Sequence, residues 1–160
     1  MKKFLLIVGL ILGTTGVSAT ESYPFDFAKF PEEHCLALNV YYEARSSNLA
    51  DKYAVADVVL NRVNDRRFPN TICEVVKDGY QEGRRDCQFS WYCDGKSDDP
   101  QDRDRWIEAQ TIAWSISKWD KHRGLTEGAT NYHATYVNPR WAKELQMVGR
   151  IGAHIFYRWE

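Results

Sequence analysis

Apolar positions recur at helical intervals along the chain from Pro31 onward. Four positions are spaced three and four residues apart, so a helix would carry them on one face: Leu36, Asn39, Val40 and Glu43. Proline fits the first turn of such a helix, and the two acidic residues after it favour the positive end of the helix dipole. We therefore expect Glu43 to point towards the protein interior, as Leu36 and Val40 do.

A second helix is predicted to begin near Asn48 or Asp51, because either side chain can cap a helix. Its apolar side chains cover most of the circumference, which is typical of a central helix. Pro69 ends this helix or closely follows its end. A third helix is predicted through the sequence RDRWIEAQTIAWSISKW, residues 103–119.

The C-terminal part of the chain contains two further predicted elements. The sequence NYHATYVN, residues 131–138, is expected to be extended, with Tyr132 and His133 on opposite sides. Asn138 followed by Pro139 is then a typical helix start. A last helix is predicted there, with one face formed by Trp141, Leu145, Val148, Gly152 and Ile155.

Turn residues and weak periodicity favour loops over residues 70–102. The chain length suits one compact domain. We therefore predict a single α+β domain in residues 20–160, mainly helical, with a small strand or hairpin element.

The N-terminus has the order of a secretory signal peptide. Lys2 and Lys3 precede the apolar run FLLIVGLIL, and small residues follow in GTTGVSA. The apolar run is much shorter than the roughly 20 residues that cross a bilayer. We expect residues 1–19 to be removed after export, which leaves a periplasmic or extracellular protein with no stable membrane span. A membrane-anchored N-terminus is the alternative.

Charge excludes one broad class of partner. The formal net charge is −1, and removing the two lysines of the predicted signal peptide makes it −3. No segment carries a dominant basic stripe, so we expect no nucleic acid partner. We expect the mature protein to be a monomer.

Four cysteines lie beyond the predicted cleavage site. An even number in an exported domain favours disulfide bonds, for which three pairings are possible. We favour Cys87 with Cys93, closing a short loop, and Cys35 with Cys73, joining the first helix to a later loop. A zinc site with all four cysteines is the alternative, but the chain has no C-x-x-C pair.

Several kinds of chemistry lack their usual motifs. There is no nucleophile elbow, no paired-histidine metal motif, no phosphate loop and no dinucleotide fingerprint. His34, His122 and His154 are scattered, and we expect them to be surface or structural residues. We expect no metal ion and no cofactor.

Glu43 remains as the candidate for chemistry. A carboxyl group among aliphatic and aromatic neighbours is desolvated, which raises its pKa and suits a general acid. Glycosidic bond cleavage is the reaction class that uses such an acid most often. Aromatic residues make up 14% of the chain and could stack on sugar rings, although they could equally fill a small core. A purely structural role for Glu43 stays open at this point.

Six ordered sequence blocks resemble the SleB/CwlJ-like family of spore-cortex-lytic cell wall hydrolases: ALNVYYEAR, AVADVVLNRV, RFPNTICEVV, CQFSWYCDG, NYHATYVNPRWA and RIGAHIFYR. The resemblance spans residues 33–158. It implies a lysozyme-like, mainly helical fold that holds peptidoglycan glycan strands in a groove. It also implies lytic transglycosylase chemistry, in which Glu43 of the YYEAR block is the catalytic acid.

The resemblance implies two groups of substrate-binding residues as well. One lies beside the cleft in the CQFSW block: Gln88, Phe89 and Ser90. The other lines the same groove in the YHATYVNP block: Tyr132, His133, Thr135 and Asn138. The signal peptide, the four cysteines and the lack of a separate wall-binding repeat differ from the spore proteins, and they favour a periplasmic or extracellular role.

Two alternatives accompany this interpretation. The enzyme could be a hydrolase, a muramidase or glucosaminidase in which a loop acid such as Asp86 or Asp94 activates water. The chain could also be a peptidoglycan-binding module without catalytic activity.

Overall fold

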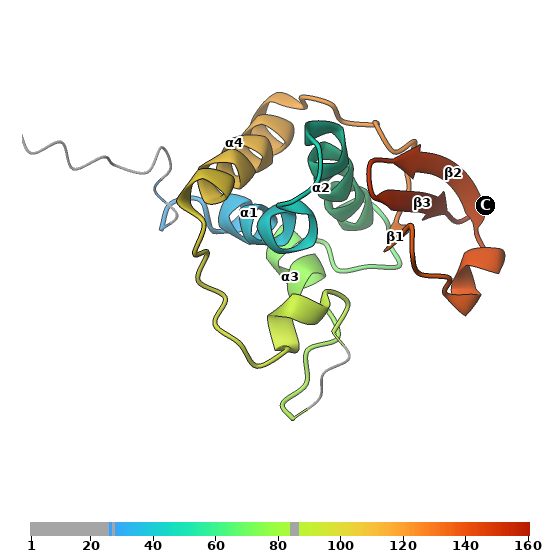
Figure 1. The fold of residues 1–160 in the computed structure, drawn as a ribbon, viewed down its shortest axis with the longest axis horizontal. Helices are drawn as coiled ribbons and strands as arrows, with labels where there is room; N and C mark the ends of the chain where they lie inside the picture. Colours follow the sequence, from blue (N-terminus) through green and yellow to red (C-terminus); the bar gives the residue numbers. More distant parts are fainter. Residues whose placement is uncertain (1–25, 27, 84–86) are drawn as a thin grey trace, which may run out of the picture.

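The computed structural model describes residue 26, residues 28–83 and residues 87–160. The predicted signal peptide, residues 1–19, lies outside these. The described residues form a cluster of helices beside a small sheet (Figure 1). The helices are α1 (Pro31–Ala44), α2 (Leu49–Val63), α3 (Ile72–Lys77) and α4 (Arg103–Trp119), with 3-10 turns η1 (Ser90–Cys93) and η2 (Arg140–Lys143). The strands are β1 (Asn131–Ala134), β2 (Gln146–Ile151) and β3 (His154–Arg158). The prediction of a mainly helical α+β domain is confirmed. None of the helices in the described ranges combines the length and apolar character needed to cross a membrane.

Helix α1 is the centre of the larger core. It contacts α2, α3 and α4, and Leu36, Asn39 and Val40 are fully buried on it. Pro31 occupies its first turn, as predicted. Asn48 caps α2 by accepting a hydrogen bond from the backbone N–H of Asp51 at 2.9 Å.

Up to residue 119 the helix predictions differ from the structure in two places and agree in a third. Helix α2 ends at Val63, well before Pro69. Helix α3 lies inside the predicted loop region; with only six residues it is too short to show a clear period. Helix α4 matches the predicted third helix, with Asp102 as its cap.

The predicted last helix is wrong. Residues 146–158 form strands β2 and β3, joined by a two-residue turn, and only η2 follows Pro139. Strand β3 is central in the antiparallel order β1-β3-β2. The helical spacing was coincidental, because Gly149 and Gly152 weaken a helix, whereas His154 and Phe156 alternate with less buried residues in the two-residue period of a strand.

A second, smaller core joins α2 to the sheet. Ala54 and Val58 of α2 contact Phe156 of β3, and all three are fully buried. The turn between β2 and β3 approaches the start of α2 closely: a Cβ atom at Gly152, where φ is +57°, would lie 2.6 Å from the Cβ of Asp51. Only glycine fits this turn as it stands.

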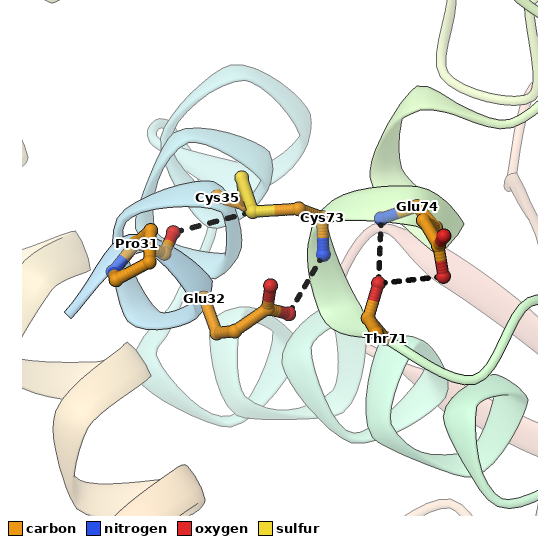
Figure 2. Close-up of a disulfide and its surroundings, with 6 residues drawn as sticks. All are labelled: Pro31, Glu32, Cys35, Thr71, Cys73 and Glu74. Atoms are coloured by element: carbon orange, nitrogen blue, oxygen red, sulfur yellow. Dashed lines mark hydrogen bonds between the residues drawn. A yellow bond between two sulfur atoms is a disulfide. The ribbon is translucent and has the colours of Figure 1, made fainter.

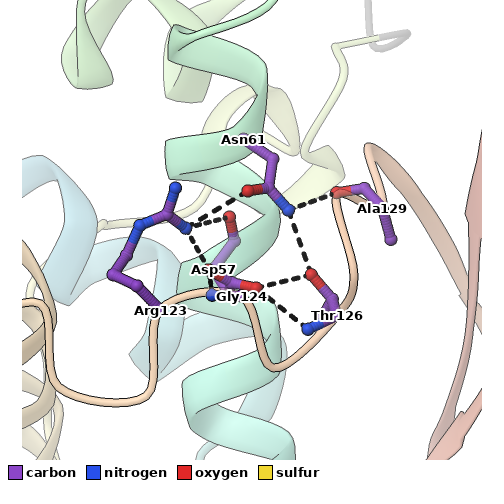
Figure 3. A network of polar contacts seen from close by, with 6 residues as sticks. All are labelled: Asp57, Asn61, Arg123, Gly124, Thr126 and Ala129. Atoms are coloured by element: carbon purple, nitrogen blue, oxygen red, sulfur yellow. Dashed lines mark hydrogen bonds and ion pairs between the residues drawn. The ribbon is translucent and has the colours of Figure 1, made fainter.

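Polar contacts also attach α2 to the loop that precedes β1 (Figure 3). Asp57 is completely buried and accepts hydrogen bonds from the backbone N–H groups of Gly124 and Thr126, each at 3.0 Å. Its carboxylate also pairs with Arg123 and accepts a hydrogen bond from the Thr126 hydroxyl at 2.6 Å. Asn61, one turn later, donates to the Ala129 carbonyl at 2.9 Å. These bonds fix the start of β1 against α2.

Two disulfides tie further segments together, and both predicted pairings are confirmed. Cys35 of α1 is bonded to Cys73 of α3, with their Cα atoms 5.2 Å apart (Figure 2). Beside this bond, the Cys73 backbone N–H donates to the Glu32 carboxylate at 3.0 Å. Cys87 is bonded to Cys93, which closes the short loop before and through η1.

The substitution Asp57→Asn should destabilise the protein by about 3–5 kcal/mol, because it leaves the Arg123 charge without its partner and turns an acceptor into a donor beside two backbone N–H groups. Urea unfolding of the two proteins measures the difference. Asp26→Asn is the matched control, since the Asp26–Lys29 pair is exposed and should contribute at most about 1 kcal/mol. Equal effects of the two substitutions would show that the Asp57 network does not hold the loop.

Replacing Cys35 and Cys73 together by serine should cost more stability than replacing Cys87 and Cys93. The sequence separations are 38 and 6 residues, and loop-closure entropy predicts losses of about 4 and about 2 kcal/mol. Urea unfolding of both double variants under non-reducing conditions tests this order. The reverse order would contradict the entropic account.

Candidate active site

Glu43 lies in the last turn of α1, where the helix meets the sheet. Its partly buried side chain accepts a hydrogen bond from the Tyr132 hydroxyl of β1, with 3.1 Å between the two oxygens. The helical face that also carries Leu36 and Val40 thus directs Glu43 inward, as the spacing predicts. The glutamate and one residue of the YHATYVNP block are in direct contact.

Burial dominates the electrostatics of Glu43. It raises the pKa of the Glu43 carboxyl above its ordinary value of 4.5, because the charged form loses hydration. The hydrogen bond from Tyr132 and the positive charges of His154 and Arg62 lower that pKa and offset part of the increase. The Glu43 carboxyl therefore stays protonated to a higher pH than an exposed glutamate. Once it loses its proton, the same hydrogen bond and positive charges stabilise the carboxylate.

Tyr132 is suited to remain a hydrogen-bond donor. Burial and the neighbouring Glu43 carboxylate hold the pKa of the Tyr132 hydroxyl well above its ordinary value of 10.0. Its ring packs against Phe156 and against the edge of His154, at centroid distances of 5.6 and 5.1 Å. These contacts fix the direction of the hydroxyl.

His154 of β3 is held from behind by Asp51 at the start of α2. Its Nδ1 lies 2.8 Å from Asp51 Oδ1, and the Ala153 N–H donates to Asp51 Oδ2 at 3.0 Å. Asp51 is fully buried; burial alone raises its pKa, but these hydrogen bonds bring the pKa of the Asp51 carboxyl below its ordinary value. A buried carboxylate therefore fixes the imidazole beside Tyr132.

The CQFSW block divides into exposed and buried residues. Gln88 and Ser90 are exposed, whereas Phe89 is 3% exposed and lies in the core, with its ring 5.2 Å from the Arg62 guanidinium carbon. Phe89 therefore cannot offer its ring face to a sugar in this structure. It supports Arg62, whose charge acts on Glu43.

A pocket of about 340 Å³ opens at the C-terminal end of α1. Tyr42 and Arg45, on either side of Glu43 in the sequence, contribute to its wall, and the Tyr42 ring stacks on Trp91 at 4.8 Å. The remaining lining residues are Tyr41, Asp94, Lys96, Ser97, Asp98, Asp99 and Gln101. Aromatic and hydrogen-bonding groups thus line a cavity at the last turn of α1, and Glu43 itself is not among its lining residues.

The other residues of the YHATYVNP block lie apart from Glu43. His133 points to the opposite face of β1 from Tyr132, where it stacks on Tyr157 and its Nε2 lies 3.0 Å from the Tyr157 hydroxyl. Thr135 and Asn138 are exposed after the strand, and the Thr135 N–H donates to the Ala153 carbonyl at 2.8 Å. Among the described residues of this block, only Tyr132 forms a hydrogen bond with Glu43.

Three residues of the site were not predicted from the sequence: Arg62 and His154, which act on Glu43, and Asp51, which holds His154. Arg62 is 2% exposed although arginine is ordinarily a surface residue, and it lies in the apolar helix α2. His154 was expected to be a surface or structural histidine, and its electrostatic effect on Glu43 depends on a strand that the sequence did not predict. No local pattern links these residues to Glu43, because they meet it only through the fold.

Of the two loop acids considered for water activation, Asp86 lies outside the described residues. Asp94 lines the pocket and forms an exposed ion pair with Lys96 at 3.2 Å. The described side chains that act on the ionisation of Glu43 are Tyr132, His154 and Arg62, and none of them is an acid. Within the described ranges, no group of three or more histidine, cysteine or acidic side chains is arranged to hold a metal ion.

A family model described as Cell Wall Hydrolase matches residues 46–157. The chain belongs to the cell wall hydrolase family. The match begins three residues after Glu43. It includes β1 and residues 88–90, called the 88–90 segment below. No curated protein sequence matches the chain significantly.

Two solved structures are similar to this member of the cell wall hydrolase family. One is described as the catalytic domain of the germination-specific lytic transglycosylase SleB from Bacillus anthracis, with 27% identity, a TM-score of 0.57, and coverage of 79% of this chain and 93% of that chain. The other is the catalytic domain of the Bacillus cereus SleB protein, with 27% identity, a TM-score of 0.57, and coverage of 80% and 91%. These similarities confirm the family resemblance seen in the sequence blocks.

Tyr132→Phe should raise the pKa of Glu43 further, because the carboxylate loses its donated hydrogen bond while the burial that penalises its charge remains. Carbon-13 NMR titration of glutamate-labelled protein measures this pKa. Tyr42→Phe is the control: Tyr42 is adjacent in sequence but stacks on Trp91, so the Glu43 titration should not move. An unchanged Glu43 pKa in Tyr132→Phe would contradict the role assigned to the hydrogen bond.

Proposed function

We propose that this chain is an exported peptidoglycan-degrading enzyme that cleaves the bond between N-acetylmuramic acid and N-acetylglucosamine as a lytic transglycosylase. The observation that carries the proposal is Glu43: a carboxyl group of raised pKa, bonded to a tyrosine, in a member of the cell wall hydrolase family. The similarity to two SleB catalytic domains, one of them described as a lytic transglycosylase, supports the same reaction.

Glu43 acts twice in the proposed reaction. As a neutral acid it donates its proton to the bridging glycosidic oxygen, so that the bond to the muramic acid anomeric carbon breaks and the glucosamine end leaves as an alcohol. The Glu43 carboxylate then takes the proton of the 6-hydroxyl on the same muramic acid while that oxygen bonds to the anomeric carbon. The product is a 1,6-anhydro end, and Glu43 regains its proton.

This reaction needs only one carboxylate. Ordinary inverting and retaining glycosidases use two, one as the acid and one to activate water or attack the sugar. The 6-hydroxyl is already attached to the reacting sugar, so intramolecularity replaces a positioned water. The electrostatic neighbours of Glu43 fit this scheme, since they are a tyrosine (Tyr132), a histidine (His154) and an arginine (Arg62), and none of them is a second acid.

Tyr132 serves the carboxylate stage of this cycle. Its hydroxyl remains protonated because its pKa is well above 10.0, and it points at Glu43 Oε2. A donor already aimed at the carboxylate stabilises the charge that appears when Glu43 loses its proton. It also leaves the other carboxyl oxygen, Oε1, for the substrate.

The 340 Å³ pocket at the end of α1 is our proposed site for part of the glycan strand. Tyr42 and Trp91 provide aromatic surface at its edge, and Gln101 and Ser97 provide groups that can bind sugar hydroxyls. Ser90 immediately precedes Trp91 and Gln88 lies three residues before it; both side chains are exposed, and we propose that they belong to the same binding region. Thr135 and Asn138 are exposed and available for more distant contacts.

The two disulfides support an oxidising, extracytoplasmic location, where peptidoglycan is found. We propose that residues 1–19 direct export and are then removed. The proposed reaction uses protein side chains only, with no cofactor or metal ion, and the enzyme acts as a monomer.

Glu43→Gln should lower the rate of wall lysis by at least about 100-fold, because glutamine cannot donate the required proton. The protein should stay folded and become more stable at neutral pH. The pKa of Glu43 is higher in the folded protein than its ordinary value of 4.5, so below pH 4.5 the carboxyl is neutral in both states and has no effect on stability. As the pH rises from there through the folded-state pKa, the cost of a buried negative charge lowers the stability of the wild type but not that of the variant. Release of dye from labelled sacculi and thermal unfolding across pH measure the two effects.

Glu74→Gln is the matched control, because Glu74 is an exposed glutamate on α3 that contacts Thr71. It should leave lysis close to the wild-type rate. Retained lysis by a folded Glu43→Gln protein would remove Glu43 from the mechanism.

Mass spectrometry of the released muropeptides separates the possible activities. Transglycosylation gives anhydro ends, which are lighter by one water than the reducing ends that hydrolysis gives. Reducing ends would indicate a hydrolase, with Asp94→Asn and Asp86→Asn as the next variants. Binding to sacculi without any release would indicate a binding module.

A further inference from the structure

Arg62 is a buried cation in the last turn of α2. It is 2% exposed, and among the described residues it forms no ion pair. Its Nη1 is buried without a hydrogen-bond partner in the described part of the chain. Burying an arginine in this way is costly, since a charge taken out of water usually requires full pairing. An apolar residue of similar size would avoid that cost.

The contacts of Arg62 connect two segments of the candidate active site. Its Nε donates to the carbonyl of Thr130, two residues before Tyr132, at 2.7 Å. Its guanidinium carbon lies 5.2 Å from the ring centroid of Phe89 and 5.3 Å from that of Phe68. The guanidinium is therefore fixed between the strand that carries Tyr132 and the segment that contains Gln88 and Ser90.

Arg62 also acts on the reacting group through its charge. Its positive charge favours the ionised form of Glu43. Burial lowers the pKa of Arg62, whereas the negative charges of Asp78 and Glu43 raise it and so favour the charged guanidinium. The interaction is screened little, because Arg62 is buried and Glu43 is partly buried. A permanent cation at this place has its largest effect at the moment when Glu43 becomes an anion.

We infer that Arg62 is a positioning residue for this reaction: it holds the Tyr132 strand against the 88–90 segment and stabilises the carboxylate that Glu43 becomes after donating its proton. The inference rests on the proposed function, because only a reaction that ionises Glu43 gives the buried cation this use. Arg62 itself does not touch substrate, since its side chain is buried.

In the described part of the chain, three elements carry charged or titratable groups that act on Glu43. Tyr132 comes from β1, His154 comes from β3 with Asp51 behind it, and Arg62 comes from α2. Tyr132 donates a hydrogen bond and His154 carries a charge only when protonated. Arg62 is the one of these groups whose positive charge persists across the working pH range.

Arg62→Met tests the inference, because methionine fills a similar volume without charge, and replacing a poorly paired buried cation by an apolar residue need not destabilise a protein. Glu43 should then titrate at a higher pH. The alkaline limb of the kcat/KM profile for lysis should move to higher pH with it, because Glu43 stays protonated for longer. We expect kcat on the plateau to fall at least about 10-fold, since the carboxylate loses a stabilising charge.

Arg62→Lys is the second variant and keeps the charge without the planar group. It should keep the alkaline limb at its wild-type position while lowering kcat, because the contacts with Phe89 and the Thr130 carbonyl are disturbed. Arg105→Met, which removes an exposed arginine on α4, is the control and should change neither the limb nor kcat.

The outcomes separate the two proposals. A folded Arg62→Met protein with an unmoved alkaline limb and an unmoved Glu43 titration by carbon-13 NMR would overturn the inference. If Arg62→Met does not fold, an alkaline limb shifted upward in Arg62→Lys would overturn it, since the charge is still present there. If the wild type releases nothing from sacculi, the proposed function fails and the inference fails with it. If the wild type is lytic but the alkaline limb and the Glu43 titration of Arg62→Met are unchanged, only the inference fails.

Discussion

Buried polar contacts along α2 determine where the sheet lies relative to the helices. Asp57 and Asn61 bind the loop before β1, Arg62 binds the carbonyl of Thr130, and Asp51 binds the turn and histidine that begin β3. Buried polar groups are costly unless their partners are in place, and hydrogen bonds are directional. Apolar contacts alone, such as Phe156 against Ala54 and Val58, would tolerate some sliding. The polar contacts select one placement of the sheet.

That placement creates the environment of Glu43. The glutamate belongs to α1, its hydrogen-bond donor to β1, and the arginine and the histidine that act on it to α2 and β3. Burial and the surrounding charges act on the carboxyl in opposite directions, and burial prevails. A group that must first give a proton and then take one back needs both influences, because neither its acid nor its anion can be too stable. The balance exists only where all four elements meet.

Local patterns in the sequence predicted the features that depend on neighbouring residues. The inward direction of Glu43 follows from its spacing with Leu36 and Val40, and the start of α1 follows from Pro31. Export and an even number of cysteines predicted disulfides, and the short loop between Cys87 and Cys93 favoured the pairing that the structure has among the three possible. The final strands were mistaken for a helix because Val148, Gly152 and Ile155 happen to fit a helical period, and the short α3 was missed within a loop-rich region. The roles of Asp57, Arg62 and His154 could not be read at all, because their partners lie far away in the chain and no spacing connects them.

The close approach of Gly152 to Asp51 couples two positions that are far apart in the sequence. A side chain at position 152 fits only if residue 51 is reduced to something as small as glycine, because the two Cβ atoms would otherwise be 2.6 Å apart. That exchange also removes the carboxylate that holds His154. The residue size allowed at position 152 and the carboxylate at position 51 are therefore linked. A related protein with a larger residue in the turn between β2 and β3 needs a different contact to orient the histidine.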